Sequence, residues 1–441
     1  MSRIIKRPGR KGYYLQVPVP RDLRQIFKTS SLVRKLSNSK NESLKIREEV
    51  ELKIKNKFVQ ENHKLKSKYP KNKTQLKQSL DINFDHIFFK EDEFLNEKAL
   101  ILSFWHCIGH VVDFEKQGSY SLIKFFDIEV IIHNYKGNFW AFENSCPHRG
   151  TKFFKKDGEA SKISCPYHGW AFDPGSSYIP RKDTFDNLED LNKIRPKIWQ
   201  IKVHYGFIFI SYKPLFEIKM QLGEKVSKIL KLIGKSIFKK HSTQYIKFNS
   251  NWKIAIENSL EPYHVSLIHK DSLAKIGIDD GENNLYNWAS ILNHQISSSR
   301  IKKSNKLIRK MLNILYEFEG YWSLYLFPFA MISSTESLTF SHQFYQPTKH
   351  LEVTECITKL WCLQSKNNSF DNALNSFYDN ASKLNLKIFK EDAEICSQIP
   401  SYSWNTEPLK YQSSLEIKIN HFRECMRNFN NIATKEWLNT K

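Results

Sequence analysis

Four side chains in one short stretch restrict the fold of this chain more than any other feature. Residues 146–170 read CPHRGTKFFKKDGEASKISCPYHGW, in which one residue separates Cys146 from His148 and two residues separate Cys165 from His168. Each pair includes a proline and is followed by a glycine, and these residues favour tight turns. Two such turns that face each other can hold a metal centre, so this part of the chain is expected to fold around one.

The ligand types leave two kinds of centre open. Two thiolates and two imidazoles suit either a zinc ion or a two-iron, two-sulfur cluster with Cys on one iron and His on the other. A zinc finger follows its second Cys with a helix that bears both His, whereas here each half of the segment contributes one Cys and one His. This interleaving gives each half one ligand for each iron and favours the cluster, with zinc and purely structural residues as the alternatives.

The segment resembles the signature of Rieske proteins, and the strings CPHRG and CPYHGW resemble the Rieske domains of non-haem iron oxygenases. The resemblance implies one two-iron, two-sulfur Rieske cluster held by Cys146, His148, Cys165 and His168. Histidine ligation raises the reduction potential well above that of an all-Cys plant-type cluster. Such a centre is suited to receiving electrons from a ferredoxin or a flavin partner.

A second group of ligands lies in residues 251–269, which read NWKIAIENSLEPYHVSLIH. The spacing of His264 and His269 predicts that both lie near one face of a helix or of its distorted end. Asn258 and Glu261 are expected one or two turns earlier on the same side. Two histidines and a carboxylate can hold Fe(II) and leave positions open for dioxygen and substrate. By spacing alone, a surface or packed pair of histidines is the commoner arrangement.

The same string resembles the mononuclear-iron segment of the Rieske oxygenases, and the two resemblances together cover about residues 85–440. In that family an Asp of a late acidic segment coordinates iron from a helix. The segment KEDAEICSQI thus implies Asp392 as the third ligand, with Glu391 beside it and Glu394 as the second choice. An exposed acidic helix start is the alternative for this segment.

The resemblance also implies a role for Glu261. In the family, a carboxylate at this position hydrogen-bonds a mononuclear-site His and a Rieske His across a subunit boundary, which here means His264 and His168 of the partner subunit. A Glu at this position resembles the branch that acts on quaternary ammonium compounds such as choline, carnitine and betaines. A cation site of that kind needs an aromatic cage. One aromatic stripe offers candidates, although such a stripe is more often sheet core: Tyr321, Trp322, Tyr325, Phe327 and Phe329.

The implied function is that of a Rieske-type oxygenase. It takes electrons from NAD(P)H through a reductase, activates dioxygen at a mononuclear Fe(II), and hydroxylates or oxidatively demethylates a small quaternary ammonium or aromatic substrate. The implied partners are a flavin and iron-sulfur reductase or a ferredoxin, and the family's usual assembly is a homotrimer. One alternative is a Rieske electron-transfer protein without oxygenase activity. The other is nucleic-acid binding through the basic N terminus.

The net charge of +22 does not belong to the whole chain. Residues 1–80 contain 22 Lys and Arg against six Asp and Glu, whereas the other 361 residues contain 46 against 40. The basic segment resembles the small N-terminal domain of some phage-type integrases, and its lysines suit contacts with phosphate. A solvated basic appendage is the favoured interpretation, so the charge does not define the function of the remainder.

Hydrophobic periodicity divides the chain into a basic N-terminal appendage (1–60), a linker (61–84), an all-β Rieske domain (85–213) and a catalytic domain (214–441). The predicted fold class is α+β, with a helix-grip catalytic domain in which helices cover an antiparallel sheet. Residues 338–347 and 351–363 are expected to form a hairpin. Ser413 and Glu416 form a predicted capping box at the start of the last helix.

Composition places the chain among globular proteins without a membrane anchor. No run approaches the ~20 apolar residues of a membrane-spanning helix, and the first thirty residues lack the apolar centre of a signal peptide. Seven cysteines scattered over a long chain without that signal argue for buried thiols and against a disulfide framework. The expected location is the cytoplasm.

Overall fold

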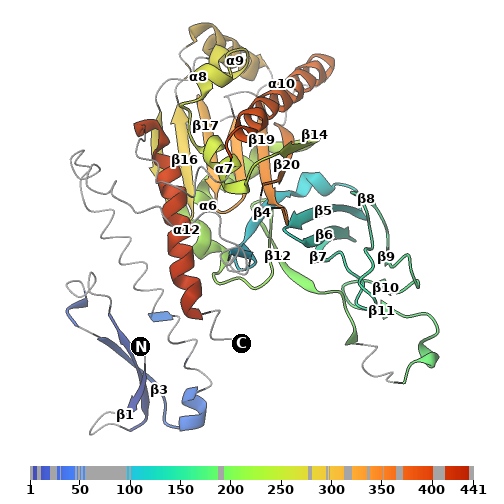
Figure 1. Cartoon of the computed structure of the whole chain (residues 1–441), viewed down its shortest axis with the longest axis vertical. Coiled ribbons are helices and arrows are strands. Elements are labelled where there is room, and N and C mark those ends of the chain that lie inside the picture. Colours follow the sequence, from blue (N-terminus) through green and yellow to red (C-terminus); the bar gives the residue numbers. More distant parts are fainter. Residues whose placement is uncertain are drawn as a thin grey trace. The chain divides into compact units, whose positions relative to one another are not determined.

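Two compact units follow each other along the chain in the computed structural model (Figure 1): Met1–Asn83 and Phe84–Lys441. The structure describes residues 101–186, 193–276, 281–294, 296, 298–311, 320–334, 338–350, 352–363, 371–400 and 413–436, and from the first hundred residues 3–6, 11–19, 27–29, 31–44, 47, 50, 53–54 and 97–98. The predicted linker, 61–84, lies outside these residues.

The N-terminal unit contains a three-stranded antiparallel sheet in the order β1 (Arg3–Lys6), β2 (Tyr13–Pro18) and β3 (Ser31–Ser37). β1 and β2 pair as an antiparallel hairpin, and β3 adds a third strand on the other side of β2. Leu15 and Val17 alternate into a small core that also contains Ile54. The alternation has the period of two that a strand with one buried face requires.

The first part of the larger unit is all-β, as predicted. Its main sheet has seven strands in the order β4-β13-β12-β7-β6-β5-β8, and a small three-stranded sheet, β11-β10-β9, lies beside it (Figure 1). The strands are β4 (His106–His110), β5 (Ser119–Phe125), β6 (Ile128–Tyr135), β7 (Asn138–Glu143), β8 (Gly158–Glu159), β9 (Ile163–Ser164), β10 (Ala171–Phe172), β11 (Ser177–Tyr178), β12 (Ile198–His204) and β13 (Phe207–Ser211).

The second part is built on an antiparallel sheet of seven strands in the order β14-β20-β19-β18-β17-β16-β15. They are β14 (Ile237–Phe248), β15 (Glu282–Leu285), β16 (Ala289–His294), β17 (Tyr321–Leu326), β18 (Ala330–Ser334), β19 (Thr339–Pro347) and β20 (Thr354–Leu363). The predicted hairpin of β19 and β20 is confirmed, with Thr339 opposite Cys362 and Pro347 opposite Thr354.

Helices α7, α10 and α12 pack on one face of this sheet (Figure 1). The helices of this part are α6 (Ile218–Ser236), α7 (Trp252–Leu260), α8 (Val265–Ile268), α9 (Ser299–Met311), α10 (Asp371–Ser397) and α12 (Ile417–Glu436). The predicted capping box of Ser413 and Glu416 is present at the short 3-10 turn that leads into α12. No helix among the described residues is long and apolar enough to span a membrane.

Helix α7 is the centre of this arrangement. Trp252, Ala255 and Ile256 are buried on different sides of it, as expected for a helix enclosed by other elements. Its Glu257 forms a buried bidentate ion pair with Arg423 of α12, with both N–O distances at 2.6 Å. This pairing compensates the burial of two charges and holds α7 against α12.

Alternate residues of the sheet that contains β14–β20 face two different environments. On β19, Ser341 contacts Asn385 of α10, whereas the adjacent His342 donates a hydrogen bond to the carbonyl of Cys107 on β4. On β20, Lys359 pairs with the buried Asp113 at 2.9 Å. One face of the sheet therefore meets the helices, and the other meets the all-β part in a seam that includes β4.

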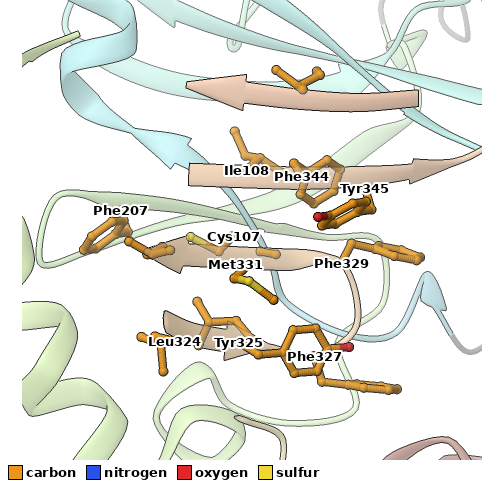
Figure 2. Close-up of a cluster of buried hydrophobic side chains, with 14 of the residues drawn as sticks. Cys107, Ile108, Phe207, Leu324, Tyr325, Phe327, Phe329, Met331, Phe344 and Tyr345 are labelled. Carbon is orange, nitrogen blue, oxygen red and sulfur yellow. The ribbon is translucent and has the colours of Figure 1, made fainter. Parts of the chain in front are cut away.

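The seam is a continuous apolar core. Figure 2 shows Cys107 and Ile108 of β4 in the same cluster as Leu324 of β17 and Phe344 of β19, together with Phe207 of β13. All of these side chains are at most 1% exposed. Because the two parts share one core, the position of residues 146–170 relative to the sheet depends on packing and not on a flexible linker.

Three histidines within this seam predict that the protein loses stability on acidification. Burial lowers the pKa of His106 and of His342 to about 3 and that of His110 to about 4. Unfolded histidine titrates near pH ~6.5, so below that value the unfolded chain binds protons that the folded chain excludes. Each histidine should lower the free energy of unfolding by about 1.4 kcal/mol per pH unit as the pH falls from ~6.5 towards its folded pKa.

Urea denaturation of the metal-free protein at several pH values measures this slope. His342→Asn should make the slope shallower by the contribution of one histidine, whereas His350→Asn, at an exposed position, should leave it unchanged. An identical slope in the wild-type protein and the His342 variant would contradict this account of the seam.

Candidate metal centres

Two loops of the all-β part have the same backbone geometry. In the first, the N–H of Cys146 donates to the carbonyl of Thr151 at 2.9 Å, and Gly150 donates to the carbonyl of Cys146 at 2.8 Å. In the second, Cys165 and Gly169 make the equivalent bonds at 2.7 and 3.0 Å. Gly150 and Gly169 both have φ of 73°, in the left-handed region that glycine tolerates best. The repeated C-P-x-x-G sequence therefore folds into two matching turns.

The side chains of these turns form one ligand set. The Cys146 and Cys165 thiols are buried and hydrogen-bonded to each other, and the His148 and His168 rings lie 4.7 Å apart. The ring of His148 stacks on Trp170 at 4.6 Å, and its Nδ1 is buried without a hydrogen-bond partner among the described residues. An orphaned imidazole nitrogen beside two thiols fits an iron-sulfur cluster, which would use that nitrogen as a ligand.

Asn144 fixes the first turn, although sequence reasoning did not identify it. Its side-chain oxygen accepts from the N–H groups of Phe153 and Phe154, and its side-chain nitrogen donates to the carbonyl of Phe154 at 2.7 Å. The residue is buried. Asn144 therefore ties the two ends of the loop together and holds Cys146 and His148 in place.

The second ligand segment is not one continuous helix but the distorted end of one, which is the second of the two forms expected from its spacing. Helix α7 ends at Leu260. His264 directly precedes the short helix α8, and His269 directly follows it. Pro262 explains the break, because a proline disfavours helical backbone in the preceding residue. Glu261 accordingly has an extended backbone, with φ −123° and ψ 143°.

This break brings both imidazoles to one point. The Nε2 atoms of His264 and His269 lie 3.3 Å apart. Asp392 reaches the same point from α10, with its Oδ1 3.0 Å from His269 Nε2 and 3.4 Å from His264 Nε2. Ligands that bind one ion at ~2.1 Å and at right angles lie about 3 Å apart, so the three atoms fit one face of an octahedral ion.

Asp392 is 4% exposed and lies near the C-terminal end of α10, so the alternative of an exposed acidic helix start is wrong. Glu394, the second choice as a ligand, is exposed. Asn258 of α7 donates to Asp392 Oδ1 at 2.8 Å and orients the carboxylate. The predicted residues Asn258, His264, His269 and Asp392 thus meet in one cluster.

Electrostatics keep the cluster charged in the absence of an ion. Burial raises the pKa of Asp392, but the hydrogen bonds with His264 and His269 outweigh burial and lower that pKa to about 2. Burial lowers the pKa of His264, but Asp392 and Glu261 outweigh it and raise the value to about 9. A divalent cation must displace a proton from such an imidazole, so metal binding and deprotonation are coupled.

A carboxylate orients each histidine from behind. His264 Nδ1 lies 2.5 Å from Glu261 Oε1, and the other Glu261 oxygen accepts from the backbone N–H groups of Tyr263 and His264. His269 Nδ1 lies 2.8 Å from Glu391 Oε2. Such partners fix the imidazole tautomer and direct the opposite nitrogen at a metal.

Glu391 and Ser272 are members of this group that sequence reasoning missed. Ser272 Oγ donates to Glu391 Oε2 at 2.8 Å and holds the carboxylate against His269. The adjacent acidic pair at 391 and 392 was visible in the sequence. Asp392 contacts the Nε2 atoms of both histidines, whereas Glu391 contacts Nδ1 of His269 alone. These different roles could be assigned only once α10 was seen packed against α8.

A cavity of about 360 Å³ opens from this cluster between the sheet and α10. Asn258, Glu261, His264, His269 and Asp392 line one part of it. Of the predicted aromatic stripe, Tyr321 alone among the described residues lines the cavity. The other four are core side chains at most 1% exposed, as the commoner arrangement predicts: Trp322, Tyr325, Phe327 and Phe329. Figure 2 shows the last three of these within the core.

Comparison with protein families agrees with this arrangement. The family model described as the Rieske [2Fe-2S] domain matches residues 104–189, and that described as the ring hydroxylating alpha subunit (catalytic domain) matches residues 237–429. Together they span more than half of the chain. The first range contains both C-P-x-x-G turns, and the second contains the histidines of α8 and Asp392 of α10.

Curated relatives are similar over part of their length. The carnitine monooxygenase oxygenase subunit of Acinetobacter pittii is 27% identical over 257 residues, which are 54% of this chain and 66% of the relative. The 2-halobenzoate 1,2-dioxygenase large subunit of Burkholderia cepacia is 30% identical over 167 residues, 34% of this chain and 35% of the relative. The chain thus spans slightly under two thirds of the first relative and about a third of the second.

Solved structures share the fold. The quaternary ammonium Rieske monooxygenase CntA superimposes with a TM-score of 0.60 and 17% identity, over 76% of this chain and 91% of that one. Naphthalene 1,2-dioxygenase from Rhodococcus sp. superimposes with a TM-score of 0.61 and 16% identity, over 79% and 94%. The predicted α+β architecture is therefore confirmed.

The contact of Glu391 with His269 generates a prediction about metal affinity. Glu391→Gln should weaken Fe(II) binding at the histidine cluster by about 10- to 100-fold, because the amide no longer supports the imidazole as a carboxylate does. Equilibrium dialysis against a graded iron chelator measures the affinity. Glu394→Gln, which changes an exposed carboxylate of the same helix, is the matched control and should bind iron normally. Equal affinities in the two variants would show that Glu391 does not support the site.

Proposed function

Since this chain belongs to the ring-hydroxylating oxygenase alpha-subunit family of Rieske non-haem iron oxygenases, we propose that it oxidises a small organic substrate with dioxygen and electrons from NAD(P)H. The observation that carries the proposal is the meeting of His264, His269 and Asp392 beside a cavity, in a chain that also contains the paired C-P-x-x-G turns. The outcome is a hydroxylation, or an oxidative demethylation that begins with hydroxylation.

The cofactors of this family are one Rieske two-iron, two-sulfur cluster and one mononuclear iron. In the proposed assignment, Cys146, His148, Cys165 and His168 hold the cluster. His264, His269 and Asp392 hold Fe(II) on one face and leave the cavity side for dioxygen and substrate. When bound, the two centres supply the electrons that activate dioxygen.

The chain's own residues position and tune these centres. Asn258 and Glu391 fix the ligands Asp392 and His269, and the apolar core around α7 keeps bulk water from the carboxylate. Glu261 holds the Nδ1 side of His264 and so determines which imidazole nitrogen faces the cavity. Its carboxylate is the proposed link between the two centres.

We place that link between subunits. Among the described residues of one chain, no hydrogen bond or ion pair joins His168 to Glu261, and His168 is exposed. Large exposed side chains flank both sites, with Tyr167 at 56%, Tyr263 at 63% and Leu267 at 68% exposure. These side chains suit a contact between copies. In the proposed homotrimer, Glu261 bonds His168 of the partner subunit.

The proposed electron donor is a flavin and iron-sulfur reductase or a ferredoxin. A cytoplasmic location stays a prediction of the sequence, and a nucleic-acid contact through residues 1–80 stays the less favoured alternative to a solvated appendage. The alternative of a Rieske electron carrier is disfavoured, because a carrier has no use for the His264–His269–Asp392 cluster and its cavity.

The proposed function is tested by reconstitution. The protein is loaded with iron and sulfide, supplied with a generic reductase and NADH, and screened for oxygen consumption with quaternary ammonium compounds and aromatic compounds. Substrate-dependent oxygen uptake that yields an oxygenated product is the expected result. Reduction of the cluster without any oxygenated product from either class would favour the electron carrier.

Glu261→Gln separates metal binding from electron transfer. The amide has one acceptor oxygen in place of two, so it cannot accept from both His264 and His168 of the partner subunit as a carboxylate does. Glu261 supports His264 as Glu391 supports His269, so the variant should bind mononuclear iron more weakly. With Fe(II) supplied in excess, it should retain both metal centres but lose product formation. Metal analysis and product assays measure the two properties. Asp271→Asn, which changes an exposed carboxylate close to His269, should leave both unchanged. Normal product formation by Glu261→Gln would rule out the bridge.

A further inference from the structure

The cavity beside the histidine cluster has two chemically different walls. The sheet contributes hydroxyl and amide groups, including Ser333, Ser341 and Gln343, whereas α10 contributes mainly apolar side chains, including Leu384 and Phe389. A ligand that fits between them has one apolar side and one polar edge. The position of each hydrogen-bonding group on the sheet wall therefore bears on which substrates bind.

The charged side chains that line the cavity are concentrated at one place. Its carboxylates and imidazoles, within the part of the chain that the structure describes, are those of Glu261, His264, His269 and Asp392, all of which belong to the proposed iron site. The phenol of Tyr321 also lines the cavity. No lysine or arginine is among these lining residues. The buried Lys418 of α12 donates to Ser323 and does not line the cavity. A ligand carboxylate that lies away from the iron site would thus lack a lysine or arginine to pair with.

Four side chains form a directed hydrogen-bond chain between α10 and the sheet: Asn385 of α10, Thr358 of β20, and Ser341 and Gln343 of β19. Asn385 Nδ2 donates to Thr358 Oγ1 at 2.8 Å, and Ser341 Oγ donates to Asn385 Oδ1 at 2.6 Å. Gln343 Nε2 in turn donates to Ser341 Oγ at 2.5 Å. Because Ser341 has already given its hydroxyl proton to Asn385, it can only accept from Gln343. The chain therefore fixes which way the Gln343 amide is turned.

The end of this chain is an acceptor without a partner. Gln343 is 1% exposed, lines the cavity, and its Oε1 has no hydrogen-bond partner among the described residues. A buried, unpaired amide oxygen is costly, so the site gains free energy from a ligand that donates to it. Two observations, the direction of the chain and the orphaned oxygen, point to the same ligand group.

We propose that Gln343 selects the substrate by accepting a hydrogen bond from an N–H or O–H group on a molecule that is neutral or positively charged. This inference rests on the proposed oxygenase function and names its substrate class. The donor group bonds Gln343 Oε1, and the rest of the molecule packs against the apolar wall of α10. Carboxylates are disfavoured at Gln343, because they offer an acceptor to an acceptor and no lysine or arginine among the lining residues pairs with them.

Three small probes of similar shape test the proposal on the iron-loaded protein. Benzamide is neutral and has N–H donors, N,N-dimethylbenzamide is neutral without one, and benzoate is an anion. Isothermal titration calorimetry measures their affinities without turnover. Benzamide should bind about three- to tenfold more tightly than the dimethyl compound, the range expected for one hydrogen bond. It should bind at least about tenfold more tightly than benzoate.

Gln343→Met tests the residue itself, because Met keeps the length of the side chain and removes the amide. In this variant benzamide and N,N-dimethylbenzamide should bind equally. Gln200→Met, at an exposed position on β12, is the control and should keep the preference of the wild-type protein. If Gln343→Met fails to fold, the ranking of the three probes by the wild-type protein still decides the proposal.

Three results would overturn it: tighter binding of benzoate than of benzamide, equal binding of the two amides by the wild-type protein, or no binding of benzamide at millimolar concentration. Iron and sulfide analysis of the same samples separates this failure from failure of the proposed function. If fully loaded protein oxygenates a carboxylate substrate, the selection by Gln343 is refuted and the oxygenase function stands. Preferential benzamide binding by protein that cannot hold iron would refute the oxygenase and leave the selectivity.

Discussion

The burial of the Asp392 carboxylate is the constraint on which the rest of the catalytic part depends. A carboxylate that is 4% exposed stays ionised only if its surroundings replace the lost water. Asn258 and the imidazoles of His264 and His269 do so by hydrogen bonding, and the two imidazoles outweigh burial and lower the pKa of Asp392 to about 2. Removal of any one of them would leave a charge in an apolar interior, so the same contacts that prepare the site for a cation also hold α7, α8 and α10 together.

The sheet beneath α7 and α10 connects the histidine cluster to the cavity and to the all-β part. Its helix-facing side contributes the polar wall of the cavity, and its opposite side shares a core with the all-β part through β4. A rigid seam keeps the iron-sulfur turns at a fixed position in each chain. Among the described residues of one chain, no hydrogen bond or ion pair connects those turns to Glu261. The proposed electron transfer between copies requires cluster turns that are fixed within their own chain and not bonded to its Glu261. Exposed aromatic side chains around these turns suit the contact with another copy.

The extent to which sequence reasoning succeeded follows from how local each feature is. The C-P-x-x-G turns are predictable because each loop closes on itself through its own glycine and backbone bonds. A distorted helix end at His264 and His269 was one of the two forms expected from their spacing, but Pro262 was recognised as its cause only in the structure. Glu391 and Gln343 were not readable as functional residues. Glu391 reaches its partner, His269, 122 positions away only after α10 packs on α8, and Gln343 acquires its direction from Asn385, which comes from another element.

The most direct test of the central claim, that Asp392 completes a mononuclear iron site separate from the iron-sulfur cluster, is the iron and acid-labile sulfide content per chain. The wild-type protein should contain about three irons and about two sulfides, and Asp392→Ala should contain about two irons with the sulfide unchanged. Full retention of iron by Asp392→Ala would contradict the assignment. Zinc without sulfide in the wild-type protein would contradict both centres.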